Sequence, residues 1–243
     1  MTTTHEHASA IICDALDENI PYDLLLVTVK DYQVRALLPA LTRCAARKIH
    51  FMFMTFEPDR LRQAVSPERA VLGMPFLQSD FDANGHLKMS IGKRETLTDD
   101  PEWAHLFRAA GLPARHEPRM DLWLRCHVPL GAAFESVAVA AVQRGKGASW
   151  SRAWTLALGV RACFAMIRSQ GYEIYPKDKA RLEKLPVFIV AGMLWGLSCI
   201  PAFRTLLATG KAECCALIDD MLASTPTATL SIDLHAIRAM KPE

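Results

Sequence analysis

A lysine at the end of an apolar run is the residue of this sequence best placed for chemistry. Residues 24–29 form an almost unbroken run of strand-forming side chains, Lys30 ends the run, and a helical pattern follows at once. Ligands of open α/β sheets bind beyond the carboxyl ends of the strands. Lys30 is therefore either a cation that meets a ligand there or a surface lysine whose aliphatic stem covers apolar neighbours.

Arg125 and Glu213 are further candidates, on helices predicted over residues 119–143 and 201–223. Arg125 stands among apolar residues, and a buried guanidinium needs an anionic partner. A substrate carboxylate, gripped through two parallel hydrogen bonds, or an internal ion pair would each provide one. Glu213 could reach the same cleft, although by itself it would pass as a surface carboxylate. His127 falls on another helix face than Arg125 and is expected to be structural.

The elements that must position these residues change type near residue 117. Before it, strand and helix patterns alternate, which predicts one sheet covered by helices. The strands are expected over residues 24–29, 49–55, 70–77, 86–91 and 112–117, and the helices over residues 32–47, 58–65 and 102–110. Later patterns are helical, over residues 119–143, 149–171, 177–184, 186–198 and 201–223, with a peripheral tail.

The predicted fold class is therefore an α/β N-terminal part followed by an all-α C-terminal domain. The N-terminal part, residues 1–117, is expected to hold an incomplete Rossmann-like parallel sheet. The helical domain is expected over residues 118–243. Strand 24–29 is apolar at every residue but Thr28, as is typical of a strand covered on both faces.

Composition excludes some classes of function. The 243 residues are 51% hydrophobic and 22% charged, and 28 basic against 26 acidic residues give a net charge of +2 without blocks of like charge, so no nucleic-acid partner is expected. Seven scattered cysteines without a Cys-x-x-Cys pair predict reduced thiols and no metal site. The polar start of the chain lacks the features of a signal peptide. Both observations favour a cytoplasmic location.

One uncharged stretch, residues 185–203, just meets the length of a membrane span. It contains Pro186 and Pro201, and charged helices flank it closely. These features favour a buried helix in an all-helical domain over a membrane-spanning one.

The sequence resembles the ketopantoate reductase (2-dehydropantoate 2-reductase) family. The resemblance covers most of residues 20–222 and is carried by Tyr-Asp-Leu-Leu-Leu-Val-Thr-Val-Lys-Asp-Tyr-Gln at 22–33, Leu-Pro-Ala-Leu at 38–41, Ala-Val-Leu-Gly-Met-Pro at 70–75, Ala-Ala-Gly-Leu-Pro at 109–113 and Leu-Trp-Leu-Arg at 122–125. It implies a Rossmann domain and a helical domain, with NADPH and a small 2-keto acid substrate bound between them. The implied reaction is hydride transfer to a ketone.

The resemblance assigns roles to four residues. Lys30 matches the family lysine near the cofactor, and Thr55, with Met54, falls where the family has an asparagine after the second strand. Arg125 falls on the position of the catalytic lysine that follows the tryptophan, and Glu213 matches a substrate-side glutamate. The resemblance therefore implies Lys30 and Thr55 as cofactor-binding residues and Arg125 and Glu213 as catalytic residues.

Several departures from the family pattern bear on activity. The Gly-rich turn that binds the pyrophosphate is missing, since the first glycine is Gly73, and the strands that should flank residues 24–29 are missing too, which leaves an apolar sheet edge. The helix asparagine of the family falls on Pro129, which should bend the helix. An arginine at position 125 stays protonated, so the proton must come from another group or from water.

Two functions remain open at this point. The first is an NADPH-dependent reductase of a 2-keto acid, impaired because the phosphate-binding turn is missing. The second is a non-catalytic, truncated relative whose helical half serves as an interaction or dimerisation module. A homodimer is compatible with both.

Overall fold

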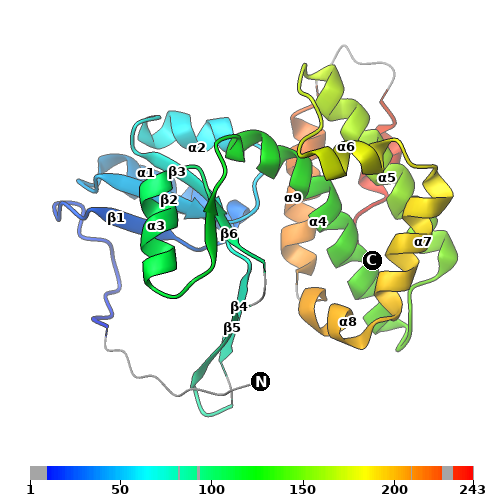
Figure 1. Cartoon of the computed structure of the whole chain (residues 1–243), viewed down its shortest axis with the longest axis horizontal. Helices are drawn as coiled ribbons and strands as arrows, with labels where there is room; N and C mark the ends of the chain where they lie inside the picture. The colour runs from blue at the N-terminus through cyan, green and yellow to red at the C-terminus, as the bar shows by residue number, and fades with distance from the viewer. Residues whose placement is uncertain (1–9, 82, 92–93, 209, 226–231, 243) are drawn as a thin grey trace.

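The computed structural model describes residues 10–81, 83–91, 94–208, 210–225 and 232–242. A half that contains a five-stranded sheet lies beside a half made of helices (Figure 1). The predicted fold class, an α/β part followed by an all-α part, is confirmed.

The sheet has the order β1-β2-β3-β6-β7. Its strands are β1 (Leu24–Val27), β2 (Lys48–Met52), β3 (Ala70–Met74), β6 (Thr96–Thr98) and β7 (Ala114–His116). The first three are parallel, as predicted, but β6 runs antiparallel to β3, so the sheet is mixed. The strand expected over residues 70–77 ends at Met74, and β4 (Leu77–Phe81) pairs with β5 (Leu87–Ile91) in a separate hairpin.

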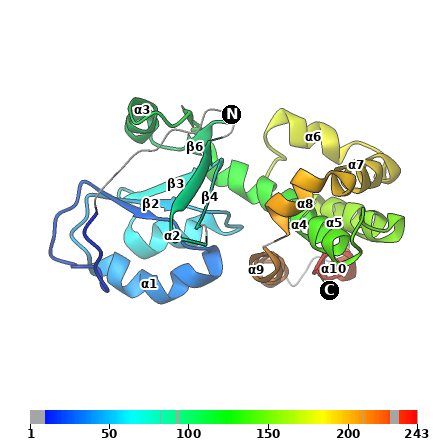
Figure 2. The ribbon, with the colours of Figure 1, turned by 90° about the horizontal axis from the view of Figure 1, so that it is seen from below.

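Helices cover both faces of this sheet. α1 (Asp31–Arg43) and α2 (Pro58–Val65) lie on one face and α3 (Pro101–Ala109) on the other (Figure 2). Alternation along β2 matches the two layers, because Ile49 and Phe51 pack in the core under α1 and α2, whereas Met52 packs with Trp103 of α3.

Strand β1 differs from the expectation of burial on both faces. It ends at Val27 and lies at the edge of the sheet, where Leu26 is 47% exposed. The expected apolar sheet edge is therefore present. Lys30 follows β1 after a short connection and is the residue just before α1.

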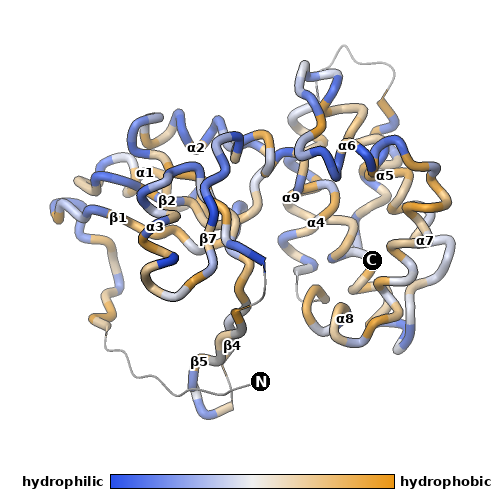
Figure 3. The backbone as a smooth tube through the Cα atoms, viewed as in Figure 1, coloured by the Kyte–Doolittle hydropathy of each residue, from blue (hydrophilic) through white to orange (hydrophobic). Residues whose placement is uncertain are grey.

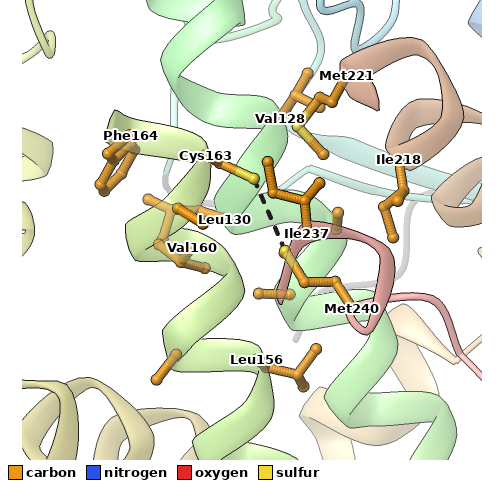
Figure 4. Packing of buried hydrophobic residues seen from close by; sticks show 14 of the residues in the cluster. Val128, Leu130, Leu156, Val160, Cys163, Phe164, Ile218, Met221, Ile237 and Met240 are labelled. Atoms are coloured by element: carbon orange, nitrogen blue, oxygen red, sulfur yellow. Dashed lines mark hydrogen bonds between the residues drawn. The ribbon is translucent and has the colours of Figure 1, made fainter. Parts of the chain in front are cut away.

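The helical half is built around two long antiparallel-packed helices, α4 and α5. Its elements are α4 (Met120–Gln143), α5 (Trp150–Ser169), α6 (Lys177–Glu183), α7 (Val187–Cys199), α8 (Pro201–Leu207), α9 (Lys211–Ala223) and α10 (Leu234–Arg238). The single helix expected over residues 201–223 is two helices. The expectation of a peripheral tail is wrong for the described part of the tail. Ile237 and Met240 are fully buried in the core between α4, α5 and α9 (Figure 4).

Helix α4 connects the two halves. Met120, Trp123 and Leu124 in its first turns belong to the core of the sheet-containing half, whereas later residues such as Val137 belong to the helical core. Within the described residues it is also long and apolar enough to cross a membrane, but it is mostly buried inside the protein.

The uncharged stretch 185–203 does not form one continuous helix. It divides between α7 and α8, and the 13 residues of α7 span roughly 20 Å, less than the roughly 30 Å of a bilayer core. If α6 and α7 are taken together they also pass the test of length and composition for a span, but they meet at an angle of 116°.

Candidate functional site

An ion pair between Lys30 and Glu213 joins the two halves of the molecule. The backbone N–H of Lys30 donates to the side chain of Gln33 at 2.9 Å, which anchors the lysine at the start of α1. Its ammonium nitrogen lies 3.0 Å from Glu213 Oε2 in the first turn of α9. The lysine side chain is 41% exposed and the glutamate 13%, so the pair borders solvent. The structure thus brings together two of the four site residues that the sequence suggested.

A third member of this cluster, Glu135 of α4, was missed from the sequence. Its side chain is only 7% exposed, and its Oε2 has no hydrogen-bond partner within the described residues. The carboxyl packs against Gly210, just before α9, where a Cβ atom would lie 2.6 Å from it. Burial, and secondarily the charge of Glu213, raise the pKa of Glu135 to about 8, although Lys30 acts in the opposite direction. At neutral pH the carboxyl is therefore mostly protonated.

One sequence signal could have pointed to Glu135. It is the only Asp, Glu, Lys or Arg between Arg125 and Arg144, in a long apolar helix. Such a carboxyl is rarely buried without a purpose or a partner. That alone does not tell which helix will cover it, because α9 lies far along the chain.

Further ion pairs hold α1, α2 and α9 together beside the cluster. Arg60 of α2 donates to both carboxylate oxygens of buried Asp31 at 3.0 Å, and Arg35 of α1 donates to Asp220 of α9 at 2.6 Å. Burial, and next the neighbouring Asp31, raise the pKa of Asp220 to about 6. Figure 2 shows α9 on the side of the helical half that faces α1. Ion pairs therefore join α1 to α2 within the sheet-containing half and α1 to α9 across the two halves.

The sequence left open whether Arg125 binds a substrate carboxylate or forms an internal ion pair, and the structure shows an internal ion pair. Its Nη2 donates to Asp59 of α2 at 3.0 Å, and the guanidinium lies 4.3 Å from the ring centre of Tyr172 and 5.4 Å from that of Phe56. Asp59 is 53% exposed, whereas Arg125 is buried. Ten residues of α4 separate Arg125 from Glu135, which is roughly 15 Å along the helix axis. No contact between Arg125 and the Lys30–Glu213 pair is among those of the described residues.

Thr55 is buried in the connection between β2 and α2. Its hydroxyl accepts a hydrogen bond from the backbone N–H of Glu57 at 3.3 Å. The neighbouring side chains divide between the two cores, since Phe53 packs in the sheet-containing half and Met54 and Phe56 pack in the helical half. This connection therefore fastens the two halves to each other, and Thr55 lies at its centre.

His127 has the structural role that was expected. Its ring stacks on Trp123 at 4.4 Å, and burial, followed by the charges of Lys179 and Arg94, lowers the pKa of His127 to about 3. Lys179 of α6, which the sequence did not single out, donates to the backbone oxygen of Trp123 at 3.0 Å. Burial lowers the pKa of Lys179 to about 7.

Comparison with known proteins gives similarity in structure only. No protein-family model matches the sequence, and no curated protein matches it. A solved ketopantoate reductase from Ralstonia eutropha matches 90% of this chain and 73% of its own, with a TM-score of 0.62 and 18% identity. A dimeric ketopantoate reductase from Staphylococcus aureus matches 92% of this chain and 76% of its own, with a TM-score of 0.62 and 10% identity.

A third match broadens the group. D-mandelate dehydrogenase, solved with NADH, matches 90% of this chain and 76% of its own, with a TM-score of 0.60 and 14% identity. The matched region includes both halves in all three proteins, since it covers nine tenths or more of this chain. This chain has the two-part fold of the ketopantoate reductases, a Rossmann-like sheet followed by a helical domain.

Proposed function

We propose that this protein is a nicotinamide-dependent oxidoreductase that reduces a small 2-keto acid with NADPH, in the manner of a 2-dehydropantoate 2-reductase. The observation that carries the proposal is the Lys30–Glu213 ion pair, with Glu135 beside it, where the two halves meet beyond the carboxyl end of β1. Similar folds in ketopantoate reductases and in a dehydrogenase solved with NADH support it.

The described residues fit one end of such a cofactor and not the other. Lys30 offers a partly exposed ammonium for the nicotinamide end, whereas Thr55 is buried in the connection between β2 and α2. No glycine precedes Gly73, so residues 1–72 contain no Gly-rich turn for a pyrophosphate. The carboxylate of Asp31, in the first turn of α1, also disfavours a phosphate there. We therefore expect the 243-residue chain to bind NADPH weakly.

Each proposed residue has one task in the reaction. A reduced nicotinamide, when bound, supplies hydride to the carbonyl carbon. The Lys30 ammonium stabilises the negative charge that develops on the carbonyl oxygen, and Glu213 keeps that ammonium in place and faces the substrate. Arg125 has no task in this proposal, because it pairs with Asp59 roughly 15 Å along α4 from Glu135, and the carboxylate of a 2-keto acid is bonded directly to the carbonyl carbon.

Calorimetry and turnover test this proposal directly. NADPH should bind the wild-type chain with a Kd near or above about 0.1 mM, because the chain lacks a turn for the pyrophosphate, and Lys30→Ala should weaken binding about tenfold. Lys146→Ala, at an exposed lysine, is the matched control. Absence of both NADPH binding and 2-keto acid reduction in the wild-type chain would refute the function, and micromolar binding would refute the impairment.

A second candidate function is an interaction module without catalysis, and the surface of α7 favours it. Phe188, Ile189, Met193 and Trp195 are all exposed on this helix, which is hydrophobic along most of its length (Figure 3). The helix would bury these side chains in a homodimer. Light scattering coupled to gel filtration should then show a dimer that Met193→Glu dissociates, whereas the control Val142→Glu, at an exposed residue of α4, leaves it intact.

A further inference from the structure

Reduction of a carbonyl group consumes a proton as well as a hydride, and the donor is not evident from the sequence. We propose that Glu135 is the proton donor, acting on a carbonyl oxygen bound at the Lys30 ammonium. The inference rests on the proposed function, since it assigns a role within the same cluster of Lys30, Glu213 and Glu135. It adds a residue that neither the resemblance nor the sequence pattern singled out.

The surroundings of Glu135 are those of a carboxylic acid kept neutral until it is used. Its side chain is buried, and its Oε2 has no hydrogen-bond partner in the described part of the chain. Gly210 leaves room for the carboxyl, because a Cβ atom there would overlap it. The titratable groups that face it are Lys30 at the start of α1, and Glu213 and Cys214 of α9.

Burial and the neighbouring charges explain why the carboxyl of Glu135 keeps its proton. One ammonium, from Lys30, already has Glu213 as its counter-ion, so a second carboxylate beside them would leave a net negative charge out of water. The thiol of Cys214 supplies no positive charge, and burial raises the pKa of Cys214 to about 12. The proton on Glu135 is therefore favoured at neutral pH, and a developing alkoxide nearby becomes its natural acceptor.

The other described groups that the sequence suggested are poorer donors. Although burial lowers the pKa of Lys30, the hydrogen bond to Glu213 and nearby carboxylates raise it above its usual value on balance. Arg125 carries a guanidinium that does not release its proton at physiological pH. His127, with its pKa lowered to about 3, is uncharged at pH 7 and is stacked on Trp123. Glu135, with a pKa of about 8, matches the acid strength that general acid catalysis needs near neutral pH.

A ketone bound against Lys30 would gain a hydride at carbon and a proton at oxygen. The hydride, which a bound reduced nicotinamide would supply while being oxidised, adds to the carbonyl carbon, and the C=O double bond becomes a single bond to oxygen. The O–H bond of Glu135 breaks while the new O–H bond of the alcohol forms. Lys30 then faces the Glu135 carboxylate and stabilises it, and solvent returns a proton to Glu135 after the alcohol leaves.

The first arm of the test needs no cofactor. The protein is labelled with ¹³C at the glutamate carboxyl carbon, and NMR follows the titration of each resonance from pH 4 to 10. One resonance should titrate near pH 8 and be missing from Glu135→Gln, but present in the control Glu68→Gln, at an exposed residue. Gly210→Ala should shift the same titration, because the new methyl group displaces the carboxyl. A Glu135 carboxyl that titrates between pH 4 and 5 would overturn the proposal.

The second arm measures turnover with NADPH and a 2-keto acid. Glu135→Gln should lower kcat about 10²-fold or more while the Kd of NADPH stays unchanged, and Glu135→Asp should restore part of the loss. In the wild-type chain kcat should fall above about pH 8, and this fall should be missing from Glu135→Gln. Wild-type turnover in Glu135→Gln would overturn the donor role alone. No turnover in the wild-type chain, with NADPH bound, would overturn the proposed function itself.

Discussion

Lys30 and Glu213 come from opposite halves of the molecule and meet at 3.0 Å between the ammonium and a carboxylate oxygen. Because the lysine is partly exposed, such a pair adds little to stability, about 0–1 kcal/mol. Its importance is positional, since it places a cation at the carboxyl end of β1 and aligns α9 with α1. Buried Glu135 completes the cluster from α4.

Glu135 should make the stability of the protein depend on pH. A carboxyl with a pKa of about 8 in the folded state, against an ordinary value of 4.5, binds its proton more tightly when folded. The free energy of unfolding should therefore decrease as pH rises from about 4.5 to about 8, by up to roughly 1.4 kcal/mol per pH unit, and level off above. Urea unfolding of Glu135→Gln between pH 5 and 9 should lack this slope; an equal slope in the variant would show that other groups cause it.

Arg125 should contribute to stability through contacts that bridge the two halves. Arg125→Ala removes the ion pair to Asp59 and the contacts with Phe56 and Tyr172, and we expect a loss of about 2 kcal/mol. Asp59→Asn keeps an acceptor at a half-exposed position and should cost less than about 1 kcal/mol. Chemical denaturation measures both. Equal costs for the two variants would contradict the bridging role.

Arg125→Ala also separates a structural role from a catalytic one. A grip of the guanidinium on the substrate carboxylate, which the resemblance implies, would require the KM for the 2-keto acid to rise at least tenfold in the folded variant. Because Arg125 pairs with Asp59 away from Lys30, we expect KM and kcat to stay unchanged. Unchanged KM and kcat in Arg125→Ala would remove this residue from the site.

The tail helix α10 should be essential to the helical core. Ile237 is fully buried between α4, α5 and α9, so Ile237→Ala should lower the free energy of unfolding by about 2–4 kcal/mol. Leu234→Ala, in the same helix but 42% exposed, should cost less than about 1 kcal/mol. Thermal or urea unfolding compares them. Similar small costs would place α10 outside the cooperative core.

The edge of β1 should govern solubility. A groove of about 230 Å³ runs beside this strand, and Leu25, Leu26 and Val29 line it together with Leu37 of α1. An apolar edge with unpaired backbone groups favours association with other strands. Leu26→Lys should therefore reduce light scattering at high protein concentration while the melting temperature changes little. Unaltered scattering would mean that the edge is not where copies associate.

Local patterns predicted most elements because their causes are local. Pro58 begins α2, and Asp100 accepts a hydrogen bond from the backbone N–H of Glu102 at the start of α3. Gly111 follows α3 with a φ of +81°, a conformation that favours glycine. Strand β6 was missed because three residues show no periodicity, and the break at Gly210 was missed because the pattern of apolar residues continues across it.

The cluster could be predicted only in part. Lys30 was recognised from the strand that precedes it, and Glu213 from the family resemblance, without evidence that they touch. Glu135 could not be assigned, because burial of a helix residue depends on which distant segment packs over it. Gly210 provides that cover, far from Glu135 in the chain.

Most strands and helices, the change of type near residue 117 and the cation after β1 were determined by the sequence alone, since residue spacing and side-chain type act over a few residues. The tertiary structure alone decided that β1 lies at the sheet edge, that Arg125 pairs with Asp59, and that α10 is buried. It also decided that a neutral acid stands beside the Lys30–Glu213 pair. The physical reason is that burial, and with it the pKa of Glu135, is set by contacts between segments that are distant in the chain.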